Sequence, residues 1–215
     1  ILSIIALLLG IGLSFLIARS VQNIISALIA ESRRLTEAAK EGKLDTRGDV
    51  EKIDFEFQGI IRGMNDTLDA VIGPLNVAAE YVDRISKGDI PPQITDTYHG
   101  DFNEIKNNLN GCIDAVNGLL KETDNLIAAV REGRLDERGD AGAFTGNWGK
   151  LVDGMNDLME AVGEPVDELM TVLRRMAVND YTTKMVKKYD GIWNDLETAT
   201  NEVEERIANT IRITN

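Results

Sequence analysis

The sequence is poor in the residue types on which most catalytic and metal sites depend. Among its 215 residues there are one cysteine, Cys112, and one histidine, His99. A single cysteine excludes an intrachain disulfide, and the usual zinc ligand sets are missing. Cys112 falls on an apolar helix stripe and His99 precedes a glycine in a loop, so both are interpreted as structural. Because there is also no phosphate-binding loop or catalytic triad, we expect a non-enzyme with no cofactor or metal.

Basic and aromatic residues are also scarce. The formal net charge is -13, the isoelectric point is near 4.6, and aromatic residues make up 5% of the chain. Binding to nucleic acid needs a basic surface, so nucleic acid is excluded as a partner. Few bulky side chains are available for a wide interior, which favours helical bundles with an acidic, solvated outer face.

Aromatic residues nevertheless recur about every 45 residues, a period that indicates an array of small repeated units. After each of them, apolar residues follow at alternating spacings of three and four. This is the heptad pattern of a helix that packs against other helices. We therefore predict an all-α fold with a bundle core that contains Phe57, Ile60, Met64, Phe102, Ile105, Leu109, Trp148, Leu151, Met155, Trp193 and Leu196.

Each unit also contains a first helix of about 16 residues, or roughly 24 Å. These helices begin at Leu28, Pro74, Leu119 and Pro165, and proline suits the first turn of a helix. They end on Gly42, Gly88, Gly133 and Asn179, residue types that adopt the left-handed conformation which closes a helix. Since one unit follows the next within a few residues, we expect continuous helices across the junctions, with bends near the prolines.

A connector of about twelve residues without helical periodicity follows each first helix. Such a segment can extend roughly 40 Å, enough to run back along the first helix, so the two helices of a unit are predicted to be parallel; antiparallel neighbours usually have shorter loops. Ile94 and Met185 are expected to pin two of the connectors. We expect one apolar residue near the start of each connector to anchor it: Leu44, Ile90, Leu135 and Tyr181.

Residues 1–18, ILSIIALLLGIGLSFLIA, carry no charge and would form a helix roughly 27 Å long. We predict a transmembrane helix surrounded by lipid, with a buried soluble helix as the alternative. The first residue is not methionine, so the span is expected to be partial or complete in an excerpt of a longer protein. Arg19, Arg33 and Arg34 follow the span, and the positive-inside tendency places the chain after about residue 19 in the cytoplasm.

A membrane helix, then a helix, a Gly-x-hydrophobic connector and a second helix entered through an acidic residue resembles the HAMP domain, a signal relay of bacterial transmembrane receptors. Four copies are expected, at 28–72, 74–117, 119–163 and 165–209. The second copy is similar to tandem copies of methyl-accepting chemotaxis proteins. The resemblance implies that each copy forms a parallel four-helix bundle in a homodimer. Two amphipathic helices alone also require a partner, because their seams stay half exposed.

Several residues match the motif of this family. The acidic residue at the start of the second helix corresponds to Glu56 and Asp101, whereas the third and fourth copies have Asn147 and Ile192 there. The first-helix proline is matched at Pro74 and Pro165. The asparagine near the middle of the second helix is present in all four copies, at Asn65, Asn110, Asn156 and Asn201.

The resemblance implies a transmembrane signal relay of a chemoreceptor in the bacterial inner (plasma) membrane. Its expected partners are a second copy of the chain, a downstream signalling domain and, through that domain, the chemotaxis kinase and adaptor. Polar residues on the helix seams indicate either marginally stable bundles that are easy to bias or heterogeneity that the bundles tolerate: Ser32, Thr36, Thr67, Thr123 and Thr200. The membrane-proximal part of a sensor histidine kinase and a passive helical spacer are the alternatives.

Overall fold

The computed structural model describes residues 2–214; Ile1, the first residue of the predicted membrane span, lies outside them. The fold is all-α, as predicted, and no strand occurs within residues 2–214. Three short 3-10 helices that the periodicity did not predict lie in the connectors: η1 (Val50–Lys52), η2 (Phe55–Phe57) and η3 (Ala141–Ala143). The α-helices are α1 (Leu2–Lys40), α2 (Gln58–Ser86), α3 (Gly100–Arg131), α4 (Asn147–Met176) and α5 (Ile192–Thr214).

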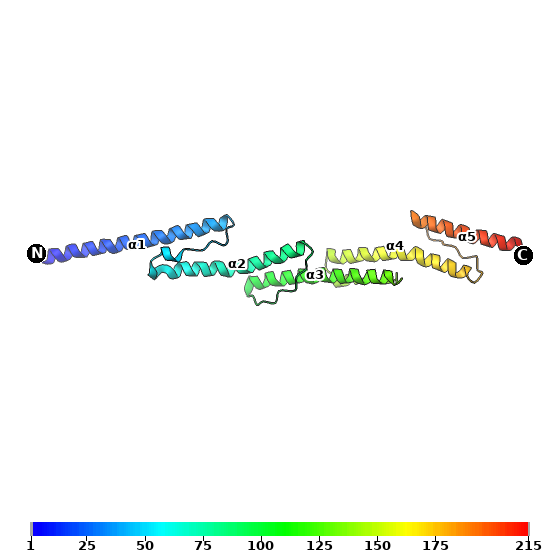
Figure 1. Ribbon diagram of the computed structural model, residues 1–215, viewed down its shortest axis with the longest axis horizontal. Coiled ribbons are helices and arrows are strands. Elements are labelled where there is room, and N and C mark those ends of the chain that lie inside the picture. The colour runs from blue at the N-terminus through cyan, green and yellow to red at the C-terminus, as the bar shows by residue number, and fades with distance from the viewer. Residues whose placement is uncertain (1, 215) are drawn as a thin grey trace. The chain divides into compact units, whose positions relative to one another are not determined.

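The chain divides into two compact units, residues 1–109 and 110–215. In the first unit, the connector after α1 runs back along that helix, and α2 begins beside it (Figure 1). The peptide groups of Arg47 and Asp49 contact Arg34 and Glu31 of α1, so the connector runs opposite to α1. Along α2 the contacts also fall in reverse order, from Asp69 opposite Arg47 to Asn65 opposite Gly48. The two helices are therefore parallel.

The second unit repeats this arrangement twice. Along the connector of the third copy, Leu135 lies against Gly163 and Gly139 against Asn156 of α4, so the connector again runs opposite to the second helix. In the fourth copy, Met185 binds Asn201 of α5 and Val186 binds Glu168 of α4. The helix–connector–helix plan with parallel helices, which the connector lengths predicted, is confirmed in both units.

All four first helices end in the same turn. Gly42, Gly88 and Gly133 have φ values of 74°, 77° and 75°, and Asn179 has a φ of 61°. In each case this residue donates to the carbonyl three residues back, and the next residue donates to the carbonyl five residues back, as for Lys43 to Ala38. These bonds satisfy carbonyls that a helix end leaves free. The predicted stop signals, including the asparagine of the fourth copy, are confirmed.

Pro74 and Pro165 lie inside continuous helices, α2 and α4, and not in the first turn of a separate helix. The predicted continuity across these junctions is therefore confirmed, and the first-turn placement of the prolines is wrong. Each proline removes one backbone N–H from the helix interior. Pro165 is completely buried, and Gly163 beside it leaves room for the backbone of Leu135.

Packing between connector and second helix follows two patterns. In the first and third copies the connector has a glycine, and a Cβ on Gly48 would lie 2.5 Å from Cγ2 of Ile61. Ile61 and the corresponding Val152 are fully buried. In the second and fourth copies the connector instead supplies a large buried side chain, Ile94 or Met185, which are 6% and 2% exposed. The predicted docking of these two residues is confirmed.

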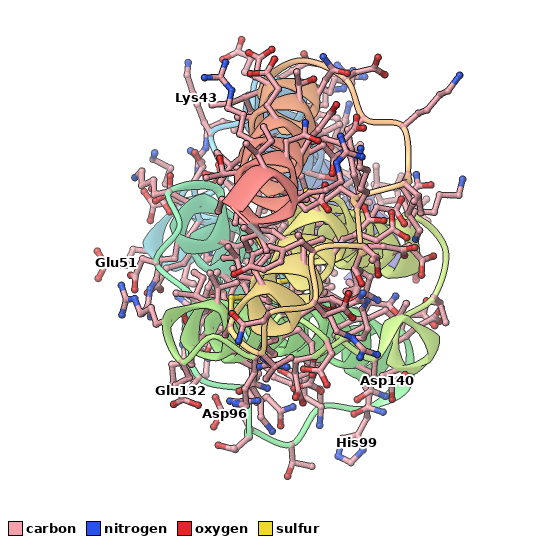
Figure 2. All side chains as sticks on the ribbon, turned by 90° about the vertical axis from the view of Figure 1, so that its right-hand side faces the viewer. Lys43, Glu51, Asp96, His99, Glu132 and Asp140 are labelled. Atoms are coloured by element: carbon pink, nitrogen blue, oxygen red, sulfur yellow. The ribbon has the colours of Figure 1, made fainter. Side chains whose placement is uncertain are left out.

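The N-terminal part of α1 differs from the other helices. By length and composition it can cross a membrane, and within residues 2–214 it is the one helix that meets this description. Its apolar side chains have no cover in the single chain; Leu9 and Phe15, for example, are 69% and 64% exposed. Polar and charged side chains elsewhere point away from the ribbon, as Figure 2 shows for Lys43, Glu51, Asp96, His99, Glu132 and Asp140.

Candidate functional site

The second helix grips the connector through an asparagine. In the first copy, the Asn65 side chain accepts from the N–H of Gly48 at 2.7 Å and donates to its carbonyl at 3.0 Å. Asn156 holds Gly139 with the same two distances, and Asn201 holds Met185 at 2.9 and 3.0 Å. One amide side chain thus satisfies both polar groups of one connector residue. The positions of these asparagines were predicted from the family motif, but the connector residues that they bind were not.

The first helix grips the connector from the other side through a glutamate that sequence reasoning missed. Glu31 accepts from the N–H of Asp49 at 2.6 Å, and Glu168 from the N–H of Val186 at 2.9 Å. Glu122 makes a longer contact of 3.4 Å with the N–H of Asp140. The signal was available, because all three glutamates stand three residues after the first-helix landmarks, where the second copy has Val77.

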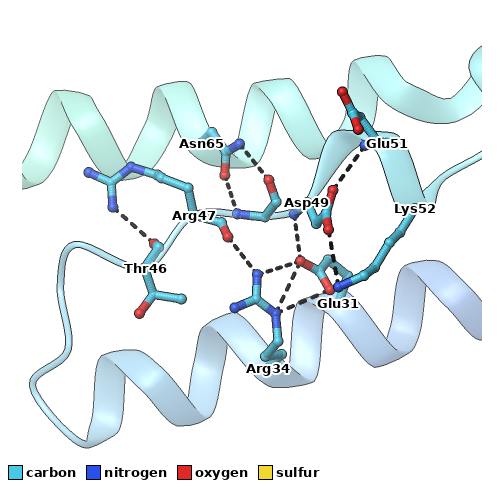
Figure 3. A network of polar contacts seen from close by, with 9 residues as sticks. Glu31, Arg34, Thr46, Arg47, Asp49, Glu51, Lys52 and Asn65 are labelled. Atoms are coloured by element: carbon cyan, nitrogen blue, oxygen red, sulfur yellow. Dashed lines mark hydrogen bonds and ion pairs between the residues drawn. The ribbon is translucent and has the colours of Figure 1, made fainter.

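Figure 3 shows that the first copy adds charged side chains to this grip. Arg34 donates to both oxygens of Glu31 and, at 2.5 Å, to the carbonyl of Arg47. Arg47 in turn pairs with Asp69 of α2 at 2.6 Å. The hydrogen bond from Arg34 lowers the pKa of the buried Glu31 carboxyl, and this effect outweighs the opposite effect of burial. Glu31 is therefore ionised at neutral pH and ties the connector to α1.

The fourth copy uses a tyrosine for the same purpose. Glu168 accepts from the hydroxyl of Tyr189 at 2.9 Å, besides the N–H groups of Val186 and Lys187. Burial raises the pKa of Glu168, but these hydrogen bonds outweigh it, so the pKa is lowered overall. Burial and the bond to Glu168 raise the pKa of Tyr189 to about 12. Lys187 also pairs with Glu164, which adds a further contact between connector and α4.

The helix pairs of the first and third copies each leave an open apolar groove. In the first copy the groove is lined by Ser32, Leu35, Thr36 and Ala39 of α1 and by Met64, Thr67 and Leu68 of α2. In the third copy it lies between α3 and α4, and Leu158 on its wall is 68% exposed. Beneath this groove, Leu126, Ala129 and Met159 form a buried cluster. The single chain thus contains a thin core beside an uncovered apolar face.

A family model described as "HAMP domain" matches residues 52–118 and 143–209, which together are more than half of the chain. The chain belongs to the HAMP domain family. HAMP domains are signal-relay modules of receptors and kinases. The two matches lie in tandem, and each extends from the end of a connector through the following helix and the next copy. The division into four HAMP copies with the predicted bounds stays a prediction.

None of the predicted HAMP bundle-core residues is buried in the single chain, and two of them, Met64 and Met155, line the grooves. Ile60, Trp148 and Leu151 are 46%, 45% and 48% exposed, and the other eight are partly buried or lie at intermediate exposure. The buried positions of the second helices include Ile61 and Val152, one residue after Ile60 and Leu151, and these two face the connector glycines. A role in the bundle core therefore concerns the assembled protein and stays a prediction.

The predicted connector anchors and motif residues differ in how far their side chains are exposed to solvent. Leu44 is 38% exposed, whereas Ile90, Leu135 and Tyr181 are partly buried. Leu135 contacts Gly163 of α4. In the second connector, Pro91 and Ile94 are buried, so they contribute to its attachment together with Ile90. Glu56 and Asp101 are exposed, Glu56 within η2 and Asp101 in the first turn of α3.

The polar seam residues satisfy their own hydroxyl groups. Thr36, Thr67 and Thr123 each donate to the carbonyl four residues earlier in the same helix, at 2.8–2.9 Å. Their hydroxyl groups are therefore paired within the helix, although these side chains are small and polar. Across residues 2–214 no group of three or more metal-ligating side chains comes together. What the arrangement offers is a set of contacts that hold two parallel helices in register through a connector.

Proposed function

We propose that this chain is a transmembrane signal relay that passes a conformational change from α1 through successive HAMP copies, without catalysing a reaction. The observation that carries the proposal is the uncovered apolar groove beside the parallel helices of the first and third copies. An apolar face of this kind is rare on a monomeric soluble protein and indicates a partner. A relay needs such a face because two packings of one interface can serve as two signalling states.

The partner that fits the grooves is a second copy of the chain, parallel to the first. Each groove needs two more helices with the same apolar spacing to complete a four-helix core, and a two-fold homodimer supplies them. The lipid-embedded N-terminal helices support this orientation, because two chains anchored in one membrane enter it from the same side. The homodimer would cover the eleven predicted bundle-core residues and the exposed Leu158.

The signal enters where α1 leaves the membrane. Because α1 is one helix from Leu2 to Lys40, a shift or rotation of its lipid-embedded part reaches Leu28 and the first groove directly. The second helix of each copy continues into the first helix of the next, so one bundle can bias the following one through a shared helix. The connectors, held by asparagine and glutamate, keep the two helices of a copy in register while they move.

The setting that we propose is a bacterial chemoreceptor in the inner membrane, with the chain after about residue 19 in the cytoplasm. Arg19, Arg33 and Arg34 favour this orientation. The similarity of the second copy to tandem copies in methyl-accepting chemotaxis proteins favours a downstream domain that controls the chemotaxis kinase through its adaptor. No nucleic acid is expected as a partner of this acidic chain.

A sensor histidine kinase is the second candidate, because HAMP domains serve both kinds of protein. The sequence that follows Asn215 decides between them. A long glutamate- and alanine-rich helical hairpin would identify a chemoreceptor. A helix with a His-Glu pair, followed by an ATP-binding domain, would identify a kinase.

The relay is tested in a chimera in which residues 28–209 replace the corresponding region of a chemoreceptor with a known ligand. Cysteines at Phe57 and Val71 report the packing of the first bundle by disulfide formation between paired chains. We expect the ligand to change the relative yields at the two positions and to change kinase activity. Identical yields with and without ligand, together with unchanged kinase activity, would contradict the relay.

A substitution that does not change the length of the chain distinguishes a passive spacer from a relay. Leu151→Lys places a charge in the groove of the third copy, whereas Asp153→Lys places it on the exposed opposite face of α4. A relay loses ligand control of the kinase with the first variant and keeps it with the second. A spacer keeps it with both, and it also tolerates an in-phase deletion of two copies wherever reach is not limiting.

A further inference from the structure

The fourth copy carries a carboxylate at a position that is apolar in the other copies. Counted from the recurring aromatic residues, the equivalent positions are Leu68, Ile113, Met159 and Glu204. Met159 belongs to the buried cluster of the third copy with Leu126 and Ala129, and Ile113 is 1% exposed. Glu204 is buried to the same degree, at 2% exposed. A charged group has therefore replaced a core side chain without moving to the surface.

Glu204 is poorly compensated at this position. Its Oε2 atom is buried and has no hydrogen-bond partner within residues 2–214. The nearest cation, Nζ of Lys184 in the connector, lies 3.9 Å away, which is too far for a hydrogen bond. Lys184 is itself 47% exposed and lies as close to Glu205, at 3.8 Å. Lys184 therefore gives Glu204 a partial countercharge and leaves its desolvation unrelieved.

A second copy of the chain cannot supply the missing donor while the connector stays in place. The burial of Oε2 is complete within one chain, and the connector lies against this part of α5, with Lys184 beside Glu204 and Met185 bound to Asn201. When the connector lifts from α5, Glu204 reaches water and recovers its hydration. The buried carboxylate therefore favours the open arrangement, whereas Asn201 and Glu168 favour the closed one through their bonds to Met185 and Val186.

We propose that Glu204 is a built-in destabilising group that favours detachment of the connector of the fourth copy, residues 182–188, from its helices. Thr200, one turn earlier on α5, is also buried and adds a second polar side chain to this core. The inference concerns local stability and does not depend on the relay.

Hydrogen–deuterium exchange of the full chain in lipid nanodiscs tests the proposal. The N–H groups of Met185 and Val186 are hydrogen-bonded only while the connector is attached, so their exchange reports its release. Glu204→Met installs the residue of the third copy. We expect exchange of 182–188 to slow by about tenfold or more, equivalent to about 1.4 kcal/mol. Unchanged or faster exchange in this variant would overturn the proposal.

Glu205 provides the matched control. It lies next to Glu204 in sequence and equally near Lys184, but its side chain is 64% exposed. Glu205→Met removes the same charge from the surface, and we expect exchange of 182–188 to change by less than about twofold. Equal slowing in both variants would show that the net charge near Lys184 matters and not burial, which would also overturn the proposal.

A reciprocal variant in the third copy tests whether a carboxylate at this position releases the connector. This test does not depend on the folding of Glu204→Met. Met159→Glu introduces the carboxylate into the third copy, where Gly139 and Asp140 offer the reporting N–H groups. Exchange of residues 136–145 is expected to accelerate by about tenfold or more, with no change at 182–188. Unaltered exchange at 136–145 would contradict the claim that this position controls connector release.

Discussion

At the scale of single residues, the connectors are held by side chains that bind backbone groups. Asn65, Asn156 and Asn201 each bridge to one connector residue with two hydrogen bonds. The asparagine positions could be predicted because they match the motif of the HAMP family. Their binding partners could not, since a contact across 16 or 17 residues depends on the path of the connector and leaves no periodic trace in the sequence.

Replacement of Asn65 by alanine removes both hydrogen bonds to Gly48 and leaves its buried peptide group unpaired. We expect a loss of about 1–3 kcal/mol in the free energy of unfolding of the first copy. Asn65→Asp keeps the acceptor for the N–H and loses the donor, so an intermediate loss is expected. Urea unfolding followed by circular dichroism measures both. Asn117→Ala, at an exposed position of α3, is the control; an equal effect there would contradict the assigned role.

The grip of Glu31 depends on pH. Its pKa in the folded chain lies below the ordinary value of 4.5, because the hydrogen bond from Arg34 outweighs burial. A carboxyl with a lowered pKa contributes its full stability above the unfolded pKa and loses it as the pH falls through the folded pKa. The melting temperature of the wild type should therefore exceed that of Glu31→Gln at pH 7, and the difference should shrink as the pH falls below about 4.5.

Glu37→Gln serves as the control for this titration, since Glu37 pairs with Lys40 at the surface, where both side chains are 65% exposed. Exposed pairs contribute little, so this variant should melt near the wild type at every pH. A difference between wild type and Glu31→Gln that stays constant from pH 7 to pH 3 would contradict the ionised role of Glu31.

At the scale of elements, the helix ends and the parallel pairing were predictable from local signals. Gly42 and Asn179 terminate their helices because the left-handed turn is encoded by one or two residues. The side of the second helix that is buried was harder to predict. The heptad seam includes Ile60, whereas the buried residue is Ile61, which faces the connector. The apolar periodicity predicts contacts with other helices, and it does not predict contacts with a connector that is not helical.

The glycine of the first connector should not tolerate a side chain. A Cβ on Gly48 would lie 2.5 Å from Ile61, so Gly48→Ala should lower the free energy of unfolding by about 1–3 kcal/mol. Gly63→Ala is the matched control, because nothing lies within 4 Å of a Cβ at Gly63 in α2 and alanine favours the helix by about 1 kcal/mol. Calorimetric melting distinguishes the two.

A second change identifies the cause of the Gly48→Ala effect. If the new methyl group clashes with Ile61, then Ile61→Ala should cost less in the Gly48→Ala background than in the wild type. Additive losses in the double variant would indicate that the methyl group is accommodated elsewhere and that the close approach of connector and helix does not set the stability of the first copy.

At the scale of the whole molecule, the chain is a membrane-competent helix followed by repeated parallel helix pairs of the HAMP family. The helix pairs of the first and third copies leave an apolar groove open, and we propose that a second chain in the same direction covers it. The repeat period and the seam predicted this partner from sequence. The glutamate contacts of the connectors and the buried carboxylate of the fourth copy were found only once the connector path was known.

Disulfide formation at the single native cysteine tests this central claim most directly. Cys112 is exposed on the groove side of α3, at the position that corresponds to Thr67 and Leu158. In the membrane-embedded full chain, oxidation should give a covalent dimer through Cys112, and likewise through a cysteine at Thr67 or at Leu158 in a Cys112→Ser background. Same-residue disulfides at all three levels require parallel chains in register, because an antiparallel two-fold pair can join equal residues at one level only. A dimer at one level alone, or more dimer from a cysteine at the outward Asp153 than at Leu158, would contradict the account.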